Sequence, residues 1–331
     1  MGKMKVAVLG SNSFSGSDFI DLLLEEGEYE VVGVSRSPEK NGVFLPYKNR
    51  NSGDFSFHQL DMNKDLPELI SLFDATEPNY IVNFAAQSEV APSWEHPEHW
   101  YETNVVALSK MINFLKDRSY LLKYVHISSP EVYGSCEGTV FEDAPLNPST
   151  PYAASKAAAD LHLFTIRKNY DFPLTMIRST NVYGAHQQLW KIIPRTIIYI
   201  KSGKKLQLHG GGKAVKSFIH ISDTSLGELS AMLSGSIGSI YHLSPEGGYS
   251  VREVVEMICE KMSVEFSDVV EIVEERPGQD RAYVIDSMKA RTEFDWRPRV
   301  SMEEGINGVV SWINANWEEI KNLPLDYIHK P

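Results

Sequence analysis

The chain has 331 residues, of which 42% are hydrophobic, and its formal net charge is −12 at pH 7. This size and apolar content predict a large core and two domains. The acidic balance argues against nucleic acid as a partner, because phosphate backbones are bound by basic surfaces. The only two cysteines are far apart in the sequence, which favours a reducing compartment and no disulfide framework.

The N-terminus runs directly into an apolar strand. No charged segment is followed by a long apolar stretch there, so no signal peptide is expected. No apolar run reaches the roughly 20 residues that a membrane-spanning helix needs. We therefore expect a cytoplasmic protein without a membrane partner.

Short apolar runs alternate with amphipathic segments through the first half of the chain. Such alternation predicts βαβ units, a buried parallel sheet and a Rossmann-like, doubly wound α/β fold. The expected strands are Met4–Leu9, Glu30–Ser35, Phe55–Leu60, Tyr80–Phe84, Lys123–Ile127 and Leu174–Arg178. The expected helices between them include Gly16–Glu26 and Trp100–Lys116.

Beyond about Gly184 the pattern becomes less regular, and glycine clusters interrupt it. We expect a dinucleotide-binding domain in residues 1–183, with a return of the chain to it around 213–243. Residues 184–331 are expected to form a smaller, mixed α/β domain for the substrate. Its expected helices are Ile192–Lys201, Val251–Lys261 and Met302–Trp317.

A loop of small residues joins the first expected strand to the first expected helix. Gly10 and Gly16 fit a three-glycine spacing, but Ser13 stands at the middle position and is followed by Phe14. Such a loop lets backbone N–H groups approach a pyrophosphate at a helix N-terminus. An ordinary turn between strand and helix remains the alternative.

The end of the second expected strand distinguishes two cofactors. An acidic residue there would bind the ribose 2′-OH of NAD, but this chain has Ser35, Arg36 and Ser37. A guanidinium beside two hydroxyls suits a 2′-phosphate, so we favour NADP, with NAD as the alternative and a solvated Arg36 left open. Further candidates for the cofactor site are Asp61, Met62, Ala85 and Ala86.

Tyr152 and Lys156 are four residues apart, which places them on one face of a helix. An ammonium beside a phenol lowers the pKa of the phenol, and the phenolate can then accept a proton from a sugar hydroxyl. Ser129 and Glu131 precede this pair. The sequence therefore predicts a redox active site at these positions.

Together these motifs resemble the extended short-chain dehydrogenase/reductase family, and within it the nucleotide-sugar 4,6-dehydratases. The segments that carry the resemblance keep the order and spacing of that family along nearly the whole chain. They are 10–16, 83–86, 102–104, 128–134, 152–156, 178–184, 210–223 and 276–281.

The resemblance implies a nucleotide sugar as substrate and a tightly bound cofactor that is regenerated in each cycle. Tyr152 would remove the proton of the sugar 4-OH, with help from Ser129, while Lys156 would lower the pKa of Tyr152 and hold the nicotinamide ribose. Glu131 would take the C5 proton before the C6 hydroxyl leaves. The family also implies a homodimer formed by helices equivalent to Trp100–Lys116 and Tyr152–Tyr170.

The chain departs from the family at Pro130, where the dTDP-glucose enzymes have an aspartic acid that protonates the leaving hydroxyl. Proline has no side-chain proton to give. We therefore expect Glu131 to serve both as base and as acid, with a raised pKa. A water relay is the alternative.

The resemblance also implies residues that bind the nucleotide sugar. Two further departures leave its base and sugar open, because Ala185 replaces a proline and Gln279 a histidine. The implied substrate residues are Gln87, Ser88, Asn181, Gln188, Arg195, Lys216 and Arg276.

A histidine-rich segment at 95–99 has the composition of a metal site, but Pro97 interrupts the spacing of its two histidines, so we expect no metal there.

Two alternatives to a dehydratase remain. A nucleotide-sugar 4-epimerase would share Ser129, Tyr152 and Lys156 without needing Glu131, and a catalytically silent nucleotide-binding module would use the scaffold alone.

Overall fold

The computed structural model describes residues 2–50, 52–135, 138–274 and 284–331. Its largest element is a seven-stranded sheet in which neighbouring strands are parallel. From edge to edge the strands are β12 (Ile240–Leu243), β7 (Leu174–Ser179), β5 (Lys123–Ile127), β4 (Tyr80–Asn83), β1 (Met4–Leu9), β2 (Tyr29–Ser35) and β3 (Phe55–Gln59). This order is doubly wound, and it confirms the Rossmann-like α/β fold.

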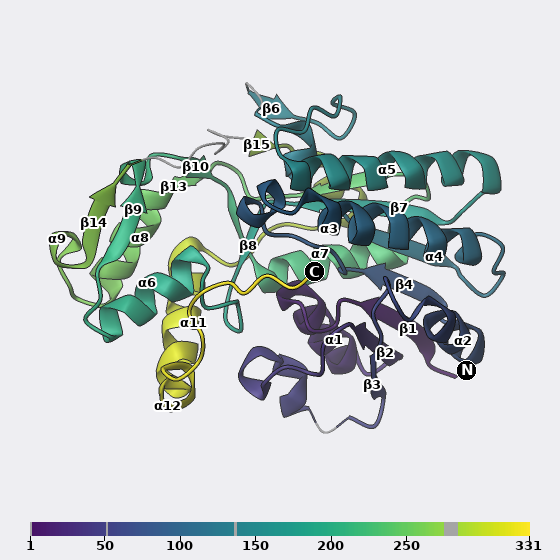
Figure 1. Ribbon diagram of the computed structural model, residues 1–331, viewed down its shortest axis with the longest axis horizontal. Coiled ribbons are helices and arrows are strands. Elements are labelled where there is room, and N and C mark those ends of the chain that lie inside the picture. Colours follow the sequence, from purple (N-terminus) through teal and green to yellow (C-terminus); the bar gives the residue numbers. More distant parts are fainter. Residues whose placement is uncertain (1, 51, 136–137, 275–283) are drawn as a thin grey trace.

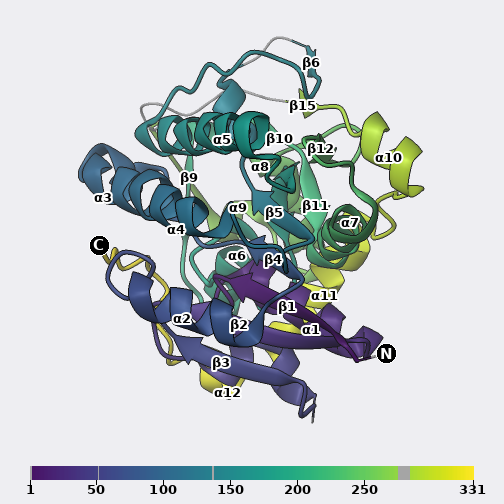
Figure 2. The same cartoon turned by 90° about the vertical axis from the view of Figure 1, so that its right-hand side faces the viewer.

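Helices cover both faces of this sheet, as Figures 1 and 2 show. Apart from the edge strand β3, the strands are mostly buried on both sides, which explains why they read as continuous apolar runs. The helices packed on one face are α1 (Phe14–Glu26), α7 (Ile221–Ser234) and α10 (Met288–Phe294). Those on the other face are α2 (Leu66–Thr76), α4 (Leu108–Leu115) and α5 (Pro151–Tyr170).

The expected helix at 100–116 is interrupted in the structure. It consists of α3 (Pro97–Tyr101), the π-helical turn η4 (Glu102–Ala107) and α4. A π-helical turn widens the backbone and often lies at a functional site. Here it contains the buried Asn104, whose side-chain amide bonds both the N–H and the C=O of Gln87, at 2.9 and 3.0 Å. Asn104 also donates to Ser155 Oγ at 2.9 Å, so the turn ties Gln87 to α5.

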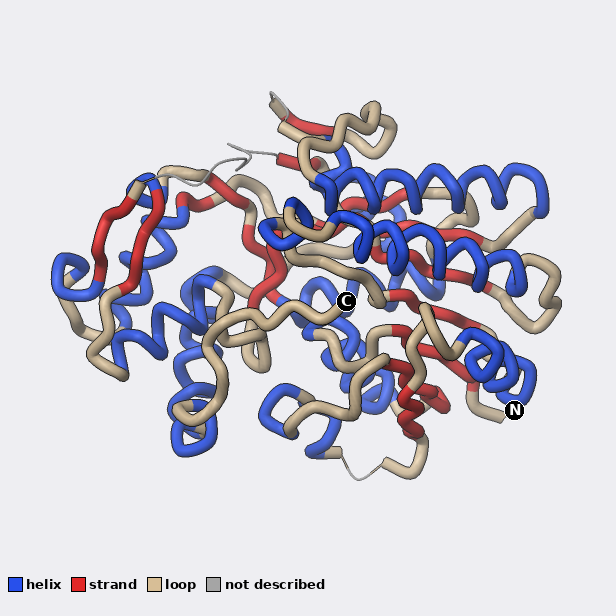
Figure 3. The backbone as a smooth tube through the Cα atoms, in the orientation of Figure 1, coloured by secondary structure: helices blue, strands red, loops and turns tan. Residues whose placement is uncertain are grey.

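A second, smaller lobe lies beside the carboxyl ends of the sheet strands (Figures 1 and 3). Ser250 and Ser301 each form a capping box with a glutamate three residues later, which explains where its two longest helices begin. The lobe contains α6 (Ile192–Lys201), α8 (Val251–Lys261), α9 (Phe266–Val269), α11 (Met302–Ala315), α12 (Trp317–Ile320), β9 (Leu206–His209) and β14 (Val270–Val273).

Short elements connect the two lobes. After β8 (Asn181–Tyr183) the chain builds α6 and β9, then returns through β11 (Phe218–His220), which pairs with β8, to α7 and β12. The other short elements are η1 (Gly42–Phe44), η2 (Pro46–Asn49), η3 (Ala91–Trp94), η5 (Pro130–Tyr133), η6 (Gly210–Gly212), β6 (Thr139–Val140), β10 (Val215–Lys216), β13 (Tyr249–Ser250) and β15 (Val284–Ile285).

After α12 the chain has no regular structure, and it runs back from the small lobe toward the large sheet (Figure 1, yellow). We call residues 323–331 the strap. Among the described residues, no helix is long and apolar enough to cross a bilayer.

Candidate active site

The loop between β1 and α1 is shaped by two glycines that no other residue could replace without a shift. Gly10 has φ +79°, and a Cβ on it would lie 2.8 Å from the backbone N of Ala85. A Cβ on Gly16 would lie 2.4 Å from the carbonyl oxygen of Gly10. Ser13, at the middle position, caps α1, since the Gly16 N–H donates to its Oγ at 3.0 Å. A helix bonds none of its first N–H groups internally, and the side chain of Ser13 takes only one of them. The first turn of α1 can therefore still offer N–H donors to an anion.

A cavity of about 450 Å³ opens at this loop. Its glycine cradle, its helix N-terminus and its apolar wall match what a dinucleotide requires, so the residues present fit the cofactor. The cofactor candidates that line it are Gly10, Ser13, Phe14, Ser35, Arg36, Asp61, Met62, Ala85 and Ala86. The substrate candidates that line it are Gln87, Ser88 and Gln188.

The end of β2 is arranged differently from the sequence-based expectation. The Oγ of Ser35 accepts the backbone N–H of Asn12 at 2.9 Å, so this hydroxyl helps to fix the loop. The guanidinium of Arg36 donates to the main-chain oxygens of Pro331 at 2.6 Å and Lys330 at 3.1 Å. The side chain expected to meet a 2′-phosphate therefore holds the strap.

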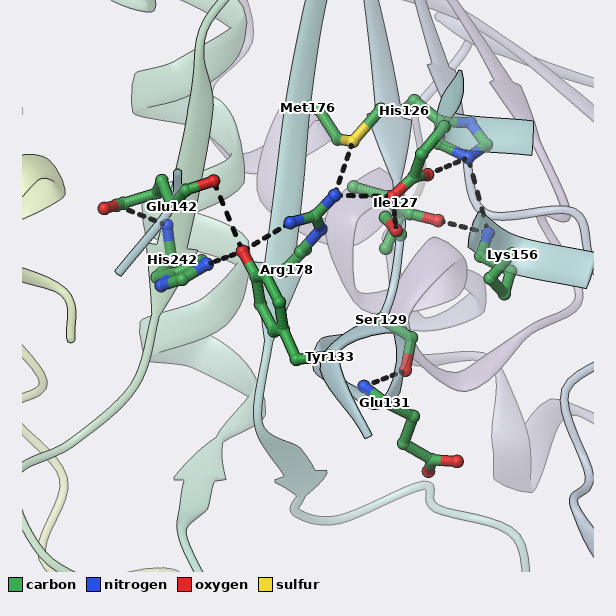
Figure 4. Close-up of polar contacts among 12 residues, drawn as sticks. His126, Ile127, Ser129, Glu131, Tyr133, Glu142, Lys156, Met176, Arg178 and His242 are labelled. Atoms are coloured by element: carbon green, nitrogen blue, oxygen red, sulfur yellow. Dashed lines mark hydrogen bonds and ion pairs between the residues drawn. The ribbon is translucent and has the colours of Figure 1, made fainter. Parts of the chain in front are cut away.

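The catalytic candidates come from two neighbouring elements. Thr150 caps α5 by accepting the N–H of Ala153, and this start of the helix places Tyr152 and Lys156 one turn apart. Ser129 follows β5 and caps η5, where its Oγ accepts the Glu131 N–H at 3.2 Å (Figure 4). Pro130 stands at the first position of this turn, which suits its fixed φ and missing N–H.

Tyr152 is buried, and its pKa is raised above that of a free phenol. Burial is the main cause and the negative charge of Glu131 is the next, whereas a hydrogen bond with Ser129 acts in the opposite direction. These interactions place Ser129, Glu131 and Tyr152 in one site. The Lys156 ammonium contacts Ile127 and His126 and is not among the groups that shift the pKa of Tyr152 here, so the expectation that it lowers this pKa stays a prediction.

Lys156 points toward the carboxyl end of β5. Its Nζ donates to the carbonyl oxygen of Ile127 at 2.8 Å and lies 3.4 Å from His126 Nε2 (Figure 4). Burial lowers the pKa of Lys156 to about 8, although Asp160 acts to raise it. Burial and the neighbouring Lys156 and Arg178 also hold the pKa of His126 well below its usual range, so the imidazole is neutral and can accept the lysine N–H.

Behind Lys156 lies a buried ion pair that the sequence analysis missed. Arg178 Nη2 and Asp160 Oδ2 are 2.7 Å apart, and each side chain is 1% exposed. Ser128 Oγ also donates to Asp160 at 2.7 Å, and Arg178 donates to the Tyr133 hydroxyl. Asp160 stands four residues after Lys156 on α5, and this spacing is the one signal in the sequence that could have found it.

The substrate candidates are divided among several places. Asn181 Nδ2 donates to the Ser217 carbonyl oxygen at 3.1 Å, which brings Asn181 beside Lys216. The Arg195 guanidinium forms an ion pair with Asp326 of the strap at 2.9 Å, so its part in substrate binding stays a prediction. Arg276 and Gln279 lie outside the described residues.

The histidine-rich segment lies on α3. His96, Glu98 and His99 each offer one ligand atom, and these atoms lie within 4.8 Å of one another. His99 Nδ1 is also 2.9 Å from Nε2 of His329 in the strap. The expectation that this segment binds no metal stays a prediction.

Comparisons with known proteins agree with this geometry. The family model of GDP-mannose 4,6-dehydratase matches residues 8–309. The dTDP-glucose 4,6-dehydratase of Streptomyces antibioticus is 33% identical over 97% of this chain and 96% of its own length. The human dTDP-D-glucose 4,6-dehydratase is 29% identical over 96% and 92%.

Solved structures lead to the same group of enzymes. The dTDP-glucose 4,6-dehydratase of Streptomyces venezuelae, with NAD bound, has a TM-score of 0.89 at 30% identity and covers 96% of this chain and all of its own. The UDP-glucuronic acid 4-epimerase of Bacillus cereus has a TM-score of 0.86 at 24% identity, a likeness of fold. The chain belongs to the GDP-mannose 4,6-dehydratase family and is a nucleotide-sugar 4,6-dehydratase of the extended short-chain dehydrogenase/reductase class.

Proposed function

We propose that this dehydratase uses NAD to convert dTDP-glucose, or a closely similar nucleotide hexose, to its 4-keto-6-deoxy derivative. The observation that carries the proposal is the convergence of Ser129, Glu131 and Tyr152 at the end of β5 and the start of α5. When bound, the dinucleotide supplies an acceptor for the C4 hydride, returns that hydride to C6, and brings positive charge to the site in its oxidised form.

Tyr152 accepts the proton of the sugar 4-OH. Burial opposes the phenolate, so its formation depends on the Ser129 hydroxyl and on positive charge supplied at the site. Lys156 is held by Ile127 and His126, and in the proposal its ammonium orients the cofactor ribose from there. A pKa of about 8 leaves Lys156 mostly protonated at neutral pH.

Glu131 acts on the other side of the reaction. Once C4 is a ketone, the C5 proton is acidic, and the Glu131 carboxylate takes it. The same carboxyl then gives a proton to the departing C6 oxygen, because Pro130 has none to give. A syn elimination places both atoms on one face of the sugar, so one carboxyl can serve both. When the hydride returns to C6, C5 takes up a proton, and this balances the proton that Tyr152 accepted from the 4-OH.

The Glu131→Gln variant tests this assignment, with Glu142→Gln as the control for a nearby glutamate outside the proposed site. We expect E131Q to oxidise C4, which is seen as cofactor absorbance at 340 nm, but to lose C5 deuterium exchange and the dehydrated product. Normal turnover by E131Q would contradict the role of Glu131. A product epimer of unchanged mass would instead indicate the epimerase alternative. The absence of any reaction with every sugar nucleotide would indicate a catalytically silent nucleotide-binding module.

We propose dTDP-glucose because it is named for the relatives of this chain. Ala185, where those enzymes have a proline, is a departure from their pattern. In the proposal Asn181, Lys216 and Arg276 bind the diphosphate and Gln188 lies near the nucleoside. Turnover of dTDP-, GDP-, UDP- and CDP-glucose, followed by mass spectrometry for the loss of one water, tests the base. Preference for a base other than thymine would contradict this part of the proposal.

We infer NAD rather than NADP because Arg36 is engaged by the strap and because NAD is the cofactor in the similar solved enzymes. Mass spectrometry of the nucleotide released from denatured protein tests this choice. Recovery of NADP would contradict this inference and support the preference for NADP that the sequence indicated.

We also propose a homodimer that forms through η4, α4 and α5. These helices carry exposed apolar side chains, including Val106, Leu161 and Tyr170. Light scattering on the eluting protein measures the mass directly, and a monomer of 37.3 kDa would contradict the dimer.

A further inference from the structure

We propose that the strap is part of the dinucleotide site, and that it keeps the reduced cofactor bound between oxidation at C4 and reduction at C6. The inference rests on the proposed function, in which one cofactor molecule must take a hydride and return it. If the reduced cofactor escaped between these steps, the enzyme would release a 4-keto hexose that had lost its hydride.

The strap lines the same cavity as the glycine loop. The strap residues that line this cavity, together with Gly10 and Ala85, are Leu323, Pro324, Asp326, Tyr327, Ile328 and Lys330. The segment crosses from the small lobe to the large sheet (Figure 1). A dinucleotide in the cavity would therefore be covered by the strap on its outer side.

On the large lobe, two anchors hold the end of the strap. Gln87 Nε2 donates to the Lys330 carbonyl oxygen at 2.7 Å, and Gln87 is itself fixed by Asn104. His329 stacks on the buried Trp100, with ring centroids 5.1 Å apart and planes within 12°. Because Gln87 and Trp100 are buried, they fix the position of the end of the strap on the large lobe.

On the small lobe, the contacts are made by the first part of the strap. Leu323 and Leu325 pack against the core of that lobe, and Asp326 pairs with Arg195. Tyr327 packs edge-on against Trp190 at 5.5 Å between ring centroids. The strap therefore joins the two lobes across the cavity.

Lys330 gives the strap a chemical role besides covering the site. Lys330 and Lys40 both line the cavity, and the charge of Lys330 acts to lower the pKa of Lys40, which shows that the two ammonium groups lie near each other. Two ammonium groups near each other in a cavity are stabilised by an anion between them. We assign Lys330 to the phosphates of the bound dinucleotide.

The contacts of the strap also explain how the cofactor can be loaded. The Arg36 and Arg195 contacts are solvent-exposed, and exposed pairs contribute little because water screens them. The anchors on the large lobe add one hydrogen bond from Gln87 and one ring stack on Trp100, so the end of the strap can open without unfolding either lobe. Opening would be the slow step of cofactor exchange.

The first test removes residues 326–331 and leaves Leu323 and Leu325 on the core. We expect the truncated chain to keep its circular dichroism spectrum, to lose its cofactor on gel filtration, and to release NADH at least tenfold faster in a fluorescence displacement assay. During turnover it should also release free NADH and 4-keto hexose. Equal NADH release from the full and truncated chains would overturn the proposal.

Point variants keep the test valid if the truncated chain does not fold. His329→Ala removes the stack on Trp100, and Lys330→Gln removes the ammonium, whereas Lys321→Gln is a matched control on the surface. We expect faster NADH release from H329A and K330Q than from K321Q. If K330Q released NADH as slowly as K321Q, the phosphate role of Lys330 would be wrong.

Failure of the strap proposal can be told apart from failure of the proposed function. NADH release is measured without any sugar, so it reports on the strap whatever the substrate is. With saturating NAD the truncated chain should oxidise C4 and accumulate free NADH, whereas the full-length chain gives the dehydrated product. A full-length chain that gave no dehydrated product with any sugar nucleotide would contradict the proposed function and leave the NADH release result unchanged.

Discussion

Two arginine–aspartate pairs, one behind Lys156 and one at the strap, differ chiefly in their exposure to solvent. The Arg178–Asp160 pair, behind Lys156, is 2.7 Å long with both side chains 1% exposed. The Arg195–Asp326 pair, at the strap, is 2.9 Å long with side chains 29% and 82% exposed. The same pair of residue types is thus found both in the interior and at the surface of the protein.

The difference indicates a division of work. A charge in the buried pair cannot lose its partner without a large desolvation cost, so the elements that carry the catalytic groups are fixed. A charge in the exposed pair is solvated by water when its partner leaves, so the strap can open and close. The reacting groups need constant positions, whereas cofactor exchange needs a movable wall.

The largest effect is expected where the chemistry lies. Tyr152→Phe removes the hydroxyl that accepts the 4-OH proton in the proposed mechanism, and we expect kcat to fall by about 10²- to 10⁴-fold, the usual share of a general base. Turnover of the nucleotide sugar measures it. Tyr170→Phe, at the exposed end of the same helix, serves as the control, and near-normal activity of Y152F would remove Tyr152 from the mechanism.

The buried pair is tested next. Asp160→Asn leaves the Arg178 guanidinium without its counter-charge, and we expect the free energy of unfolding to fall by about 3–5 kcal/mol. Urea denaturation measures this change. Asp171→Asn, which breaks the exposed pair with Arg167 on α5, should change it by less than about 1 kcal/mol. Equal effects of the two variants would contradict the comparison.

The pH dependence of stability examines the same buried region. Burial, and next the charge of Arg178, lower the pKa of His242 to about 3, and its Nε2 lies 2.7 Å from the Tyr133 hydroxyl. Between pH 6.5 and 3 the unfolded chain therefore binds a proton that the folded chain does not, so stability falls as the pH falls. At pH 5 His242 lowers the free energy of unfolding by about 2 kcal/mol relative to its value at neutral pH.

Urea denaturation of the wild type and His242→Gln between pH 7.5 and 5 measures that contribution. The slope of the free energy of unfolding against pH should be shallower in H242Q, whatever the effect of the substitution at pH 7.5. Parallel slopes would mean that His242 is protonated in the folded protein.

The smallest effect is expected at the strap. Asp326→Asn should lower the free energy of unfolding by less than about 1 kcal/mol, because both partners are partly solvated. Its effect on NADH release should shrink as salt is raised, since salt screens exposed charges. A loss of stability as large as that of D160N would show that the buried and the exposed arginine–aspartate pairs do not differ as proposed.

The sequence by itself determined the βαβ order, the glycine loop and the placement of Ser129, Glu131, Tyr152 and Lys156. Each of these features depends on residues close together in the chain. The periodicity of apolar residues indicates the strands and helices, the missing Cβ explains the glycines, and the spacing of one helical turn places Tyr152 beside Lys156. The expected chemistry of these residues came from the family resemblance.

Only the tertiary structure decided what the charged groups contact. Arg36 bonds Pro331 across 295 residues, and Asp160 pairs with Arg178, which comes from a different element. Burial also raises the pKa of Tyr152 in the folded chain. Contacts between distant segments and the loss of water on packing have no signature in a local pattern. Therefore the strap and the buried pair could not be predicted from the sequence.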